Sequence, residues 1–191
     1  MRLAIVILLG LGCGLDLAGC ARDNGQPDQG NGNVAAAPGE PVTGVLDRSH
    51  AGTPAPDLAF ENGRGEPTSM AAFRGRPALV NLWATWCGPC VIEMPSLDAL
   101  AVREGGALQV VALSQDVGGR DLVTQFFAAR RFRALEANLD GQMGFMTSLK
   151  LGTLPTTILY DAQGREVWRM VGRADWASER VARLLDEAEA G

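Results

Sequence analysis

The feature that most constrains this chain is a pair of cysteines between an apolar strand and a helix. Residues 78–84 read ALVNLWA, a short and mostly apolar run that predicts a strand buried on both faces. The motif Cys87-Gly88-Pro89-Cys90 follows, and apolar residues at helical spacing come directly after it. This order predicts an α/β domain in which both thiols lie in the first turn of a helix.

Strand-like and helix-like segments alternate through the rest of the folded part. The predicted elements are a hairpin at 56–68, a helical turn at 69–73, strands at 78–84, 108–114 and 135–139, helices at 90–103, 121–131 and 141–150, a hairpin at 156–171, and a last helix capped by Asp175. The pattern predicts an α/β fold with a mixed central sheet flanked by helices, an N-terminal β-hairpin and a central αβ insertion.

A Cys-x-x-Cys pair by itself is compatible with several roles. A structural zinc site needs four ligands, and covalent haem attachment needs a histidine where Val91 stands. A purely structural disulfide across so short a loop stabilises little. A redox pair explains the spacing, because free N–H groups and the helix dipole lower the pKa of a thiol at a helix N-terminus. Cys87 is therefore the predicted nucleophile and Cys90 the predicted resolving thiol.

The other two cysteines, Cys13 and Cys20, fall in a segment with the form of an export signal. One arginine precedes an almost uncharged run that is too short to span a bilayer. Leu17-Ala18-Gly19-Cys20 resembles the lipobox of bacterial lipoproteins, although Asp16 departs from that pattern. The resemblance implies a signal peptide at 1–19 and lipidation of Cys20, and an ordinary secretory signal is the alternative.

The same N-terminal segment predicts where in the cell the protein is located. Residues 20–50 are rich in Gly, Asn, Gln, Pro, Asp and Ala and predict a flexible linker with a root-mean-square span of roughly 30 Å. The folded domain is then expected at 51–191. Ala21 after the lipidated cysteine favours, by resemblance to Gram-negative lipoproteins, the outer over the inner membrane, with the domain on the periplasmic face.

Net charge and composition limit the kinds of partner that this chain is expected to bind. The chain has 47% hydrophobic residues, enough for a core, and a net charge of −5. A net negative charge argues against a nucleic-acid partner.

Beyond the dithiol, the chain resembles thioredoxin-like proteins over residues 52–189. LVNLWATWCGPC, from Leu79 to Cys90, is similar to their active-site strand and turn, and Pro95 to the proline that kinks their active-site helix. Thr153-Leu154-Pro155-Thr156-Thr157 resembles their cis-proline loop. The resemblance implies a thioredoxin fold, a cis bond before Pro155, no cofactor or metal, and substrate contacts from Trp86, Gly88, Pro89, Leu154 and Pro155.

Within that superfamily the chain is most similar to the membrane-tethered TlpA/ResA-type branch. The N-terminal hairpin, the central insertion and the sequence from Cys90 to Pro95, which matches C-x-x-E-x-P, carry this resemblance. It implies a thiol–disulfide oxidoreductase outside the cytoplasm, with protein disulfides as substrates and a membrane thiol reductase as electron donor. The Gly-Pro dipeptide favours a reductant, for example in cytochrome c maturation or metal-site assembly, and an oxidase or isomerase is the alternative.

Two further positions bear on proton transfer. Asn81 stands six residues before Cys87, where thioredoxin has a buried acid, and an amide cannot take that proton. Glu93 lies one helical turn after Cys90 and on the same face. We expect Glu93 to supply the ionisable group, half-buried and with a raised pKa. A solvated helix carboxylate is the alternative.

Two other classes with this fold fit the sequence less well. A peroxiredoxin normally has Thr three residues before its reactive cysteine, where Ala84 stands here. A metallochaperone usually has Cys-x-x-x-Cys and a histidine within the fold, whereas His50 is the only histidine and falls in the predicted linker. Trp86 is expected at the active-site surface, and Trp83, Trp168 and Trp176 in the core.

Overall fold

A computed structural model describes residues 44–188, which form one mixed sheet with helices on both faces. The predicted signal peptide, the lipobox-like sequence with Cys20, Cys13 and most of the predicted linker lie outside the described residues. The strands are β1 (Val45–Asp47), β2 (Ala59–Glu61), β3 (Pro67–Ser69), β4 (Ala78–Trp83), β5 (Gln109–Ser114), β6 (Asn138–Leu139), β7 (Thr156–Tyr160) and β8 (Glu166–Val171). The helices are α1 (Gly88–Glu104), α2 (Arg120–Arg130), α3 (Gly144–Ser148) and α4 (Glu179–Leu185), with short 3-10 turns η1 (Met70–Phe73) and η2 (Asp186–Ala188).

The strand order within the described residues is β1-β8-β7-β4-β5-β6-β2-β3. β4, β5 and β6 run parallel, whereas β7, β8 and β1 add antiparallel on one side and the β2–β3 hairpin on the other. All six residues of β4 are buried, as its apolar sequence predicts for a central strand covered on both faces. The mixed sheet, the N-terminal hairpin and the insertion carrying α2 and β6 match the predicted fold.

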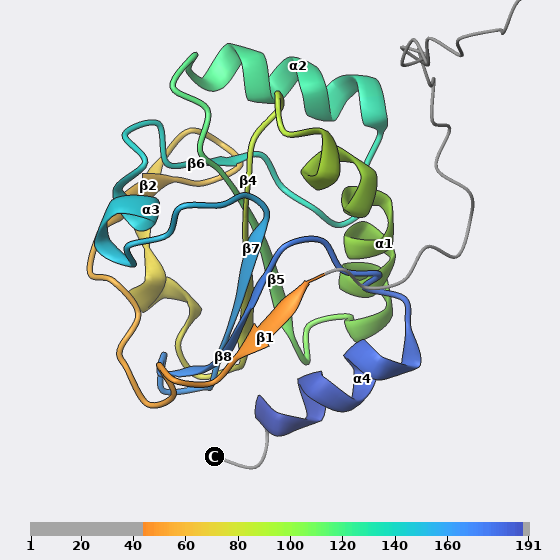
Figure 1. Cartoon of the computed structure of the whole chain (residues 1–191). Coiled ribbons are helices and arrows are strands. Elements are labelled where there is room, and N and C mark those ends of the chain that lie inside the picture. The colour runs from red at the N-terminus through yellow and green to blue at the C-terminus, as the bar shows by residue number, and fades with distance from the viewer. Residues whose placement is uncertain (1–43, 189–191) are drawn as a thin grey trace, which may run out of the picture. The chain divides into compact units, whose positions relative to one another are not determined.

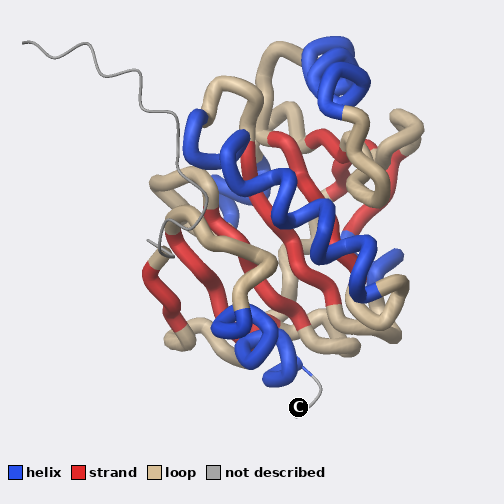
Figure 2. The backbone as a smooth tube through the Cα atoms, turned by 90° about the vertical axis from the view of Figure 1, so that its right-hand side faces the viewer, coloured by secondary structure: helices blue, strands red, loops and turns tan. Residues whose placement is uncertain are grey.

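Two apolar clusters fill the space on either side of the sheet. Residues of α1, α2 and α4 pack on one face, around Leu79, Met94 and Trp168. Residues of α3, η1 and β2 pack on the other, around Val80 and Phe145. Figure 1 shows α1 and α4 on one side of the strands and α3 on the other, and Figure 2 shows α1 lying across the sheet. Trp83, Trp168 and Trp176 are fully buried, so the predicted core role of these residues is confirmed.

A buried carboxylate missed by the sequence analysis joins α1 to the insertion. Asp98 is 8% exposed and accepts the backbone N–H groups of Arg133, Ala134 and Leu135 at 2.9–3.0 Å. Burial raises the pKa of Asp98, but these N–H groups outweigh burial, so its pKa is held below the usual range. The Leu135 N–H is thereby unavailable to the sheet at the start of the strand predicted at 135–139, and the observed strand is limited to Asn138–Leu139.

Three other predicted boundaries are wrong. The folded part begins before residue 51, because β1 pairs with the edge of β8 and Arg48 forms an ion pair with Glu187. The last helix is capped by Ser178, whose hydroxyl accepts the N–H of Val181, while Asp175 caps only the preceding turn. The helix predicted at 141–150 shortens to α3, because Asp140 accepts the N–H groups of Gly144 and Phe145 and starts the helix there.

Candidate active site

The two cysteines of the motif form a disulfide at the N-terminus of α1. Cys87 is the N-cap residue, its Cα lies 5.3 Å from that of Cys90, and its sulfur accepts the Cys90 N–H at 3.3 Å. Pro89 stands in the first turn, where its missing N–H leaves no intrahelical bond unmade. Cys87 is 6% exposed and Cys90 is 0% exposed, so Cys87 is the more accessible of the two cysteines.

The sheet register brings the cis-proline loop to the same edge as the dithiol. Leu82, near the end of β4, pairs with Thr156, the first residue of β7. The loop before β7 therefore lies beside the turn after β4. The bond between Leu154 and Pro155 is cis, as predicted, and Leu154 packs against the cluster that contains both cysteines.

The remaining predicted contact residues lie at the surface around Cys87. Gly88 and Pro89 are exposed, and Trp86 is 67% exposed, which is unusual for a tryptophan. An exposed indole next to Cys87 offers apolar area that an incoming polypeptide could contact.

Glu93 is more deeply buried than the sequence analysis expected. Its side chain extends from α1 to contacts with β4 and with the segment after β8, and the residue is 2% exposed. Oε1 accepts from Asn81 Nδ2 at 2.7 Å, and Oε2 accepts from the Ala174 backbone N–H at 2.9 Å. Burial raises the pKa of Glu93 to about 7, although the Ala174 and Asn81 hydrogen bonds act in the opposite direction. The indole of Trp176 also favours the ionised form of Glu93, although its N–H forms no hydrogen bond.

The raised pKa of Glu93 predicts an unusual dependence of stability on pH. An unfolded glutamate titrates near 4.5 and the folded one near 7, so the native state binds more protons between these values. The contribution of Glu93 to the free energy of unfolding is greatest below pH 4.5. It falls as the pH rises towards 7, by roughly 3 kcal/mol in all. Glu93→Gln should flatten this slope and should be at least as stable as the wild type at pH 8.

Urea unfolding between pH 4 and pH 8 measures this effect. Glu179→Gln is the matched control, because the Glu179 side chain is 97% exposed and its loss should leave the slope unchanged. A Glu93→Gln variant that keeps the wild-type slope would contradict the raised pKa.

A second buried carboxylate, Asp116, fixes the turn that precedes the dithiol. Its two oxygens accept the Thr85 N–H at 2.9 Å and the Thr85 hydroxyl at 2.8 Å, and one of them also accepts the Ser114 hydroxyl at 2.7 Å. The turn then closes through a bond from the Cys87 N–H to the Ala84 carbonyl. The sequence analysis missed Asp116, for which the only signal was an acid just after a buried strand.

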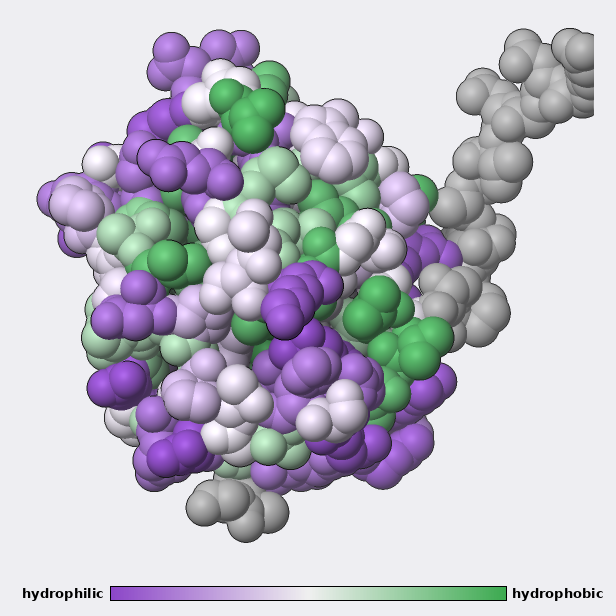
Figure 3. Space-filling view, turned by 60° about the vertical axis from the view of Figure 1, so that its left-hand side comes forward, coloured by the Kyte–Doolittle hydropathy of each residue, from purple (hydrophilic) through white to green (hydrophobic). Residues whose placement is uncertain are grey.

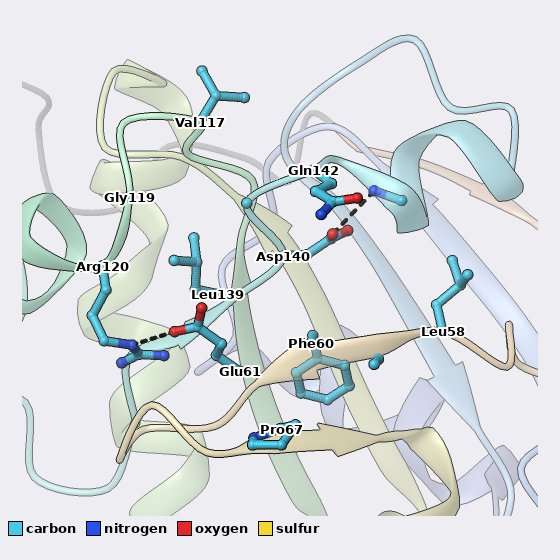
Figure 4. A pocket seen from close by; sticks show the side chains of 13 residues that line it. Leu58, Phe60, Glu61, Pro67, Val117, Gly119, Arg120, Leu139, Asp140 and Gln142 are labelled. Carbon is cyan, nitrogen blue, oxygen red and sulfur yellow. Dashed lines mark hydrogen bonds and ion pairs between the residues drawn. The ribbon is translucent and has the colours of Figure 1, made fainter.

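A pocket of about 630 Å³ lies apart from the two cysteines, which do not line it. Figure 4 shows β2 and β3 on one side, with Phe60 and Pro67, and the segment around Asp140 and the start of α2 on the other. The Arg120–Glu61 ion pair, at 2.6 Å, ties the N-terminal hairpin to α2. On the face shown in Figure 3, hydrophobic residues occur in separate groups among hydrophilic ones.

Residues 44–188 contain neither a membrane-spanning helix nor a metal-binding cluster. No helix there is both long and apolar enough to cross a membrane. No group of three or more His, Cys, Asp or Glu side chains in that range is arranged to hold a metal ion.

The model of the Redoxin family matches residues 50–185 of this chain. Among curated proteins, the chain is 31% identical over 147 residues to the thiol:disulfide interchange protein DsbE of Pseudomonas fluorescens biotype C, covering 72% of this chain and 79% of that protein. It is also 31% identical over 114 residues to the thiol-disulfide oxidoreductase ResA of Geobacillus kaustophilus. That match covers 59% of this chain and 64% of ResA, less than two thirds of its length.

Solved structures show the same fold. A protein from Chlorobium tepidum described as a thiol:disulfide interchange protein DsbE superposes with a TM-score of 0.62 at 23% identity, over 72% of this chain and 97% of that one. The exposed lipoprotein thioredoxin of Streptococcus pneumoniae superposes with a TM-score of 0.61 at 17% identity, over 69% of this chain and 99% of that one. At these identities the likeness establishes the thioredoxin fold.

Proposed function

Because the chain belongs to the Redoxin family of thioredoxin-like proteins, we propose that it is a thiol–disulfide oxidoreductase that reduces protein disulfides outside the cytoplasm. The observation that carries this proposal is the Cys87–Cys90 pair at the N-terminus of α1, with one sulfur reachable and the other enclosed. Relatives whose names describe thiol–disulfide exchange support it.

The reaction begins on the reduced protein with Cys87 as thiolate. The Cys90 N–H, directed at the Cys87 sulfur, and the N-terminal end of the helix dipole stabilise that negative charge. The thiolate attacks one sulfur of a client disulfide, forming a mixed disulfide and releasing the other client sulfur as a thiolate. Cys90 then attacks the Cys87 sulfur, which restores the protein disulfide and frees the second client thiol. Two electrons pass from the dithiol to the client.

Glu93 is the proposed acceptor of the Cys90 proton. Both residues are enclosed, and Glu93 follows Cys90 by one turn of α1. A carboxyl with a pKa of about 7 can take a proton from a thiol and return it near neutral pH. Trp86, Gly88, Pro89 and the Leu154–Pro155 loop are the proposed contacts of the client polypeptide.

The proposed cellular location and partners of this protein are based on its N-terminal sequence and on the proteins similar to it. Lipidation at Cys20 would hold the domain on the periplasmic face of a membrane, preferably the outer one, and the relatives include a protein described as an exposed lipoprotein. A reductant in an oxidising compartment must be re-reduced continually, which calls for a membrane thiol reductase as donor. Cytochrome c maturation or metal-site assembly is the proposed setting.

The reduction potential tests the direction of exchange. The protein is equilibrated with mixtures of reduced and oxidised glutathione, and the Cys87–Cys90 disulfide is quantified after acid quenching. A reductant should give a potential close to that of thioredoxin, about −270 mV, whereas an oxidase would lie near about −120 mV. The reduced protein should also reduce insulin. A high potential together with no insulin reduction would replace the reductant by the oxidase alternative.

A further inference from the structure

The Glu93 carboxyl is held by a buried amide whose own hydrogen bonds are incomplete. Asn81 is fully buried in β4, and its Nδ2 lies 2.7 Å from Glu93 Oε1 and 2.9 Å from Thr157 Oγ1. Its Oδ1 is also buried and has no hydrogen-bond partner. A buried amide oxygen without a donor is costly, so this orientation must be stabilised by what the nitrogen donates to.

This orientation of Asn81 matches the ionised form of Glu93. A carboxylate only accepts hydrogen bonds, and both of its oxygens have donors here, from Asn81 and from the Ala174 N–H. The second amide hydrogen is donated to Thr157 Oγ1.

The neutral form of Glu93 calls for the opposite orientation. A proton on Oε1 would turn that oxygen into a donor facing the Asn81 NH2 group. A half-turn of the amide exchanges its oxygen and nitrogen. Oδ1 would then accept both the Glu93 O–H and the Thr157 O–H, and Nδ2 would move to the position where Oδ1 now has no partner.

We propose that the Asn81 amide turns over with the protonation of Glu93, which makes Asn81 a positioning residue for the proton step. The inference rests on the proposed function, in which the proton of Cys90 passes to Glu93 as the Cys87–Cys90 bond forms and the mixed disulfide breaks. The leaving client sulfur takes the electron pair of the broken mixed-disulfide bond, and Glu93 later returns the proton to that sulfur. Asn81 gives each form of the carboxyl a matched hydrogen bond, so the carboxyl stays in place through both steps.

Groups other than Asn81 also affect the protonation of Glu93. Arg173, in the segment after β8, favours the ionised form through its charge, as the Trp176 indole does. On α1 itself, Cys87 and Cys90 do not titrate while they are joined as a disulfide. The oxidised protein therefore isolates the Glu93 titration from that of the thiols.

Nuclear magnetic resonance on the oxidised full chain tests the proposal. The side-chain ¹⁵N–¹H signals of Asn81 should shift between pH 5 and pH 9 with the same midpoint as the ¹³C carboxyl signal of Glu93. Asn81→Leu should raise the Glu93 midpoint by about one pH unit, a tenfold change in proton affinity, because the charge-assisted bond it removes is stronger than the neutral one. Tyr160→Phe is the control, since its buried hydroxyl in β7 has no hydrogen-bond partner, and it should leave the midpoint unchanged.

Two results would overturn the coupling: Asn81 signals that do not follow the Glu93 midpoint, or an Asn81→Leu midpoint equal to that of the wild type. If Asn81→Leu does not fold, the wild-type Asn81 signals decide alone. Neither titration involves a client or a free thiol. A chain that fails to exchange disulfides but shows coupled midpoints would therefore refute the proposed function and leave the amide coupling standing.

Discussion

Cys87→Ser should lower the rate of disulfide reduction by at least about 1000-fold, to the background rate, because a serine hydroxyl is not ionised at neutral pH and cannot replace a thiolate. Cys90 cannot take over the attack, since it is fully enclosed whereas Cys87 reaches the surface next to the exposed Trp86. The measurement is insulin reduction with the reductant held constant.

Cys90→Ser is the matched variant for this prediction. It should also lose turnover, but it should still form a mixed disulfide on Cys87, because only the resolving step is removed. A Cys87→Ser variant that reduces insulin well above background, or that captures substrate as Cys90→Ser does, would show that the roles of the two sulfurs are wrongly assigned.

Arg169→Met should destabilise the domain by about 3–5 kcal/mol, because it leaves a buried carboxylate without its partner. Arg169 and Glu166 form two parallel bonds within β8, of 2.6 and 2.7 Å, and their side chains are 5% and 1% exposed. The lone Glu166 would have to remain charged in an apolar site or bind a proton, and either change favours unfolding. Urea unfolding at pH 7 measures the loss.

The double variant Glu166→Leu/Arg169→Met separates a buried charge from lost packing. It removes both charges together, so it should recover most of the stability that the single variant loses. A double variant as unstable as Arg169→Met alone would mean that the arginine acts through its packing and not through its pairing with Glu166.

The sequence predicts best those elements whose signals are local. The apolar run of β4, the dithiol turn and the helical spacing of α1 lie next to one another in the chain, and all three are found where expected. β1 could not be found in this way, because three residues in a polar stretch become a strand only by pairing with β8, more than 120 residues away. The shortening of β6 has a similar cause, since Asp98 reaches the insertion from α1.

The same distinction holds for the site. The spacing of Cys87 and Cys90, and the proline at 155, were sufficient to predict a cysteine pair at the start of α1 and a cis bond in the loop before β7. The extent to which Glu93 is buried was not predictable. Its burial depends on Asn81 in β4 and on Ala174, which lies 81 positions after Glu93 in the chain. Asn81 was noted as unable to take a proton, but its contact with the carboxyl emerges only from the packing of α1 against the sheet.

Capture of a substrate on Cys87 tests the central claim most directly. Reduced Cys90→Ser protein is incubated with a peptide disulfide, quenched with acid, and mapped by mass spectrometry, which separates Cys87 from Cys13 and Cys20. We predict one peptide joined to Cys87 and released by dithiothreitol. A protein that keeps its reduced mass, or that carries the peptide on another cysteine, would contradict the account.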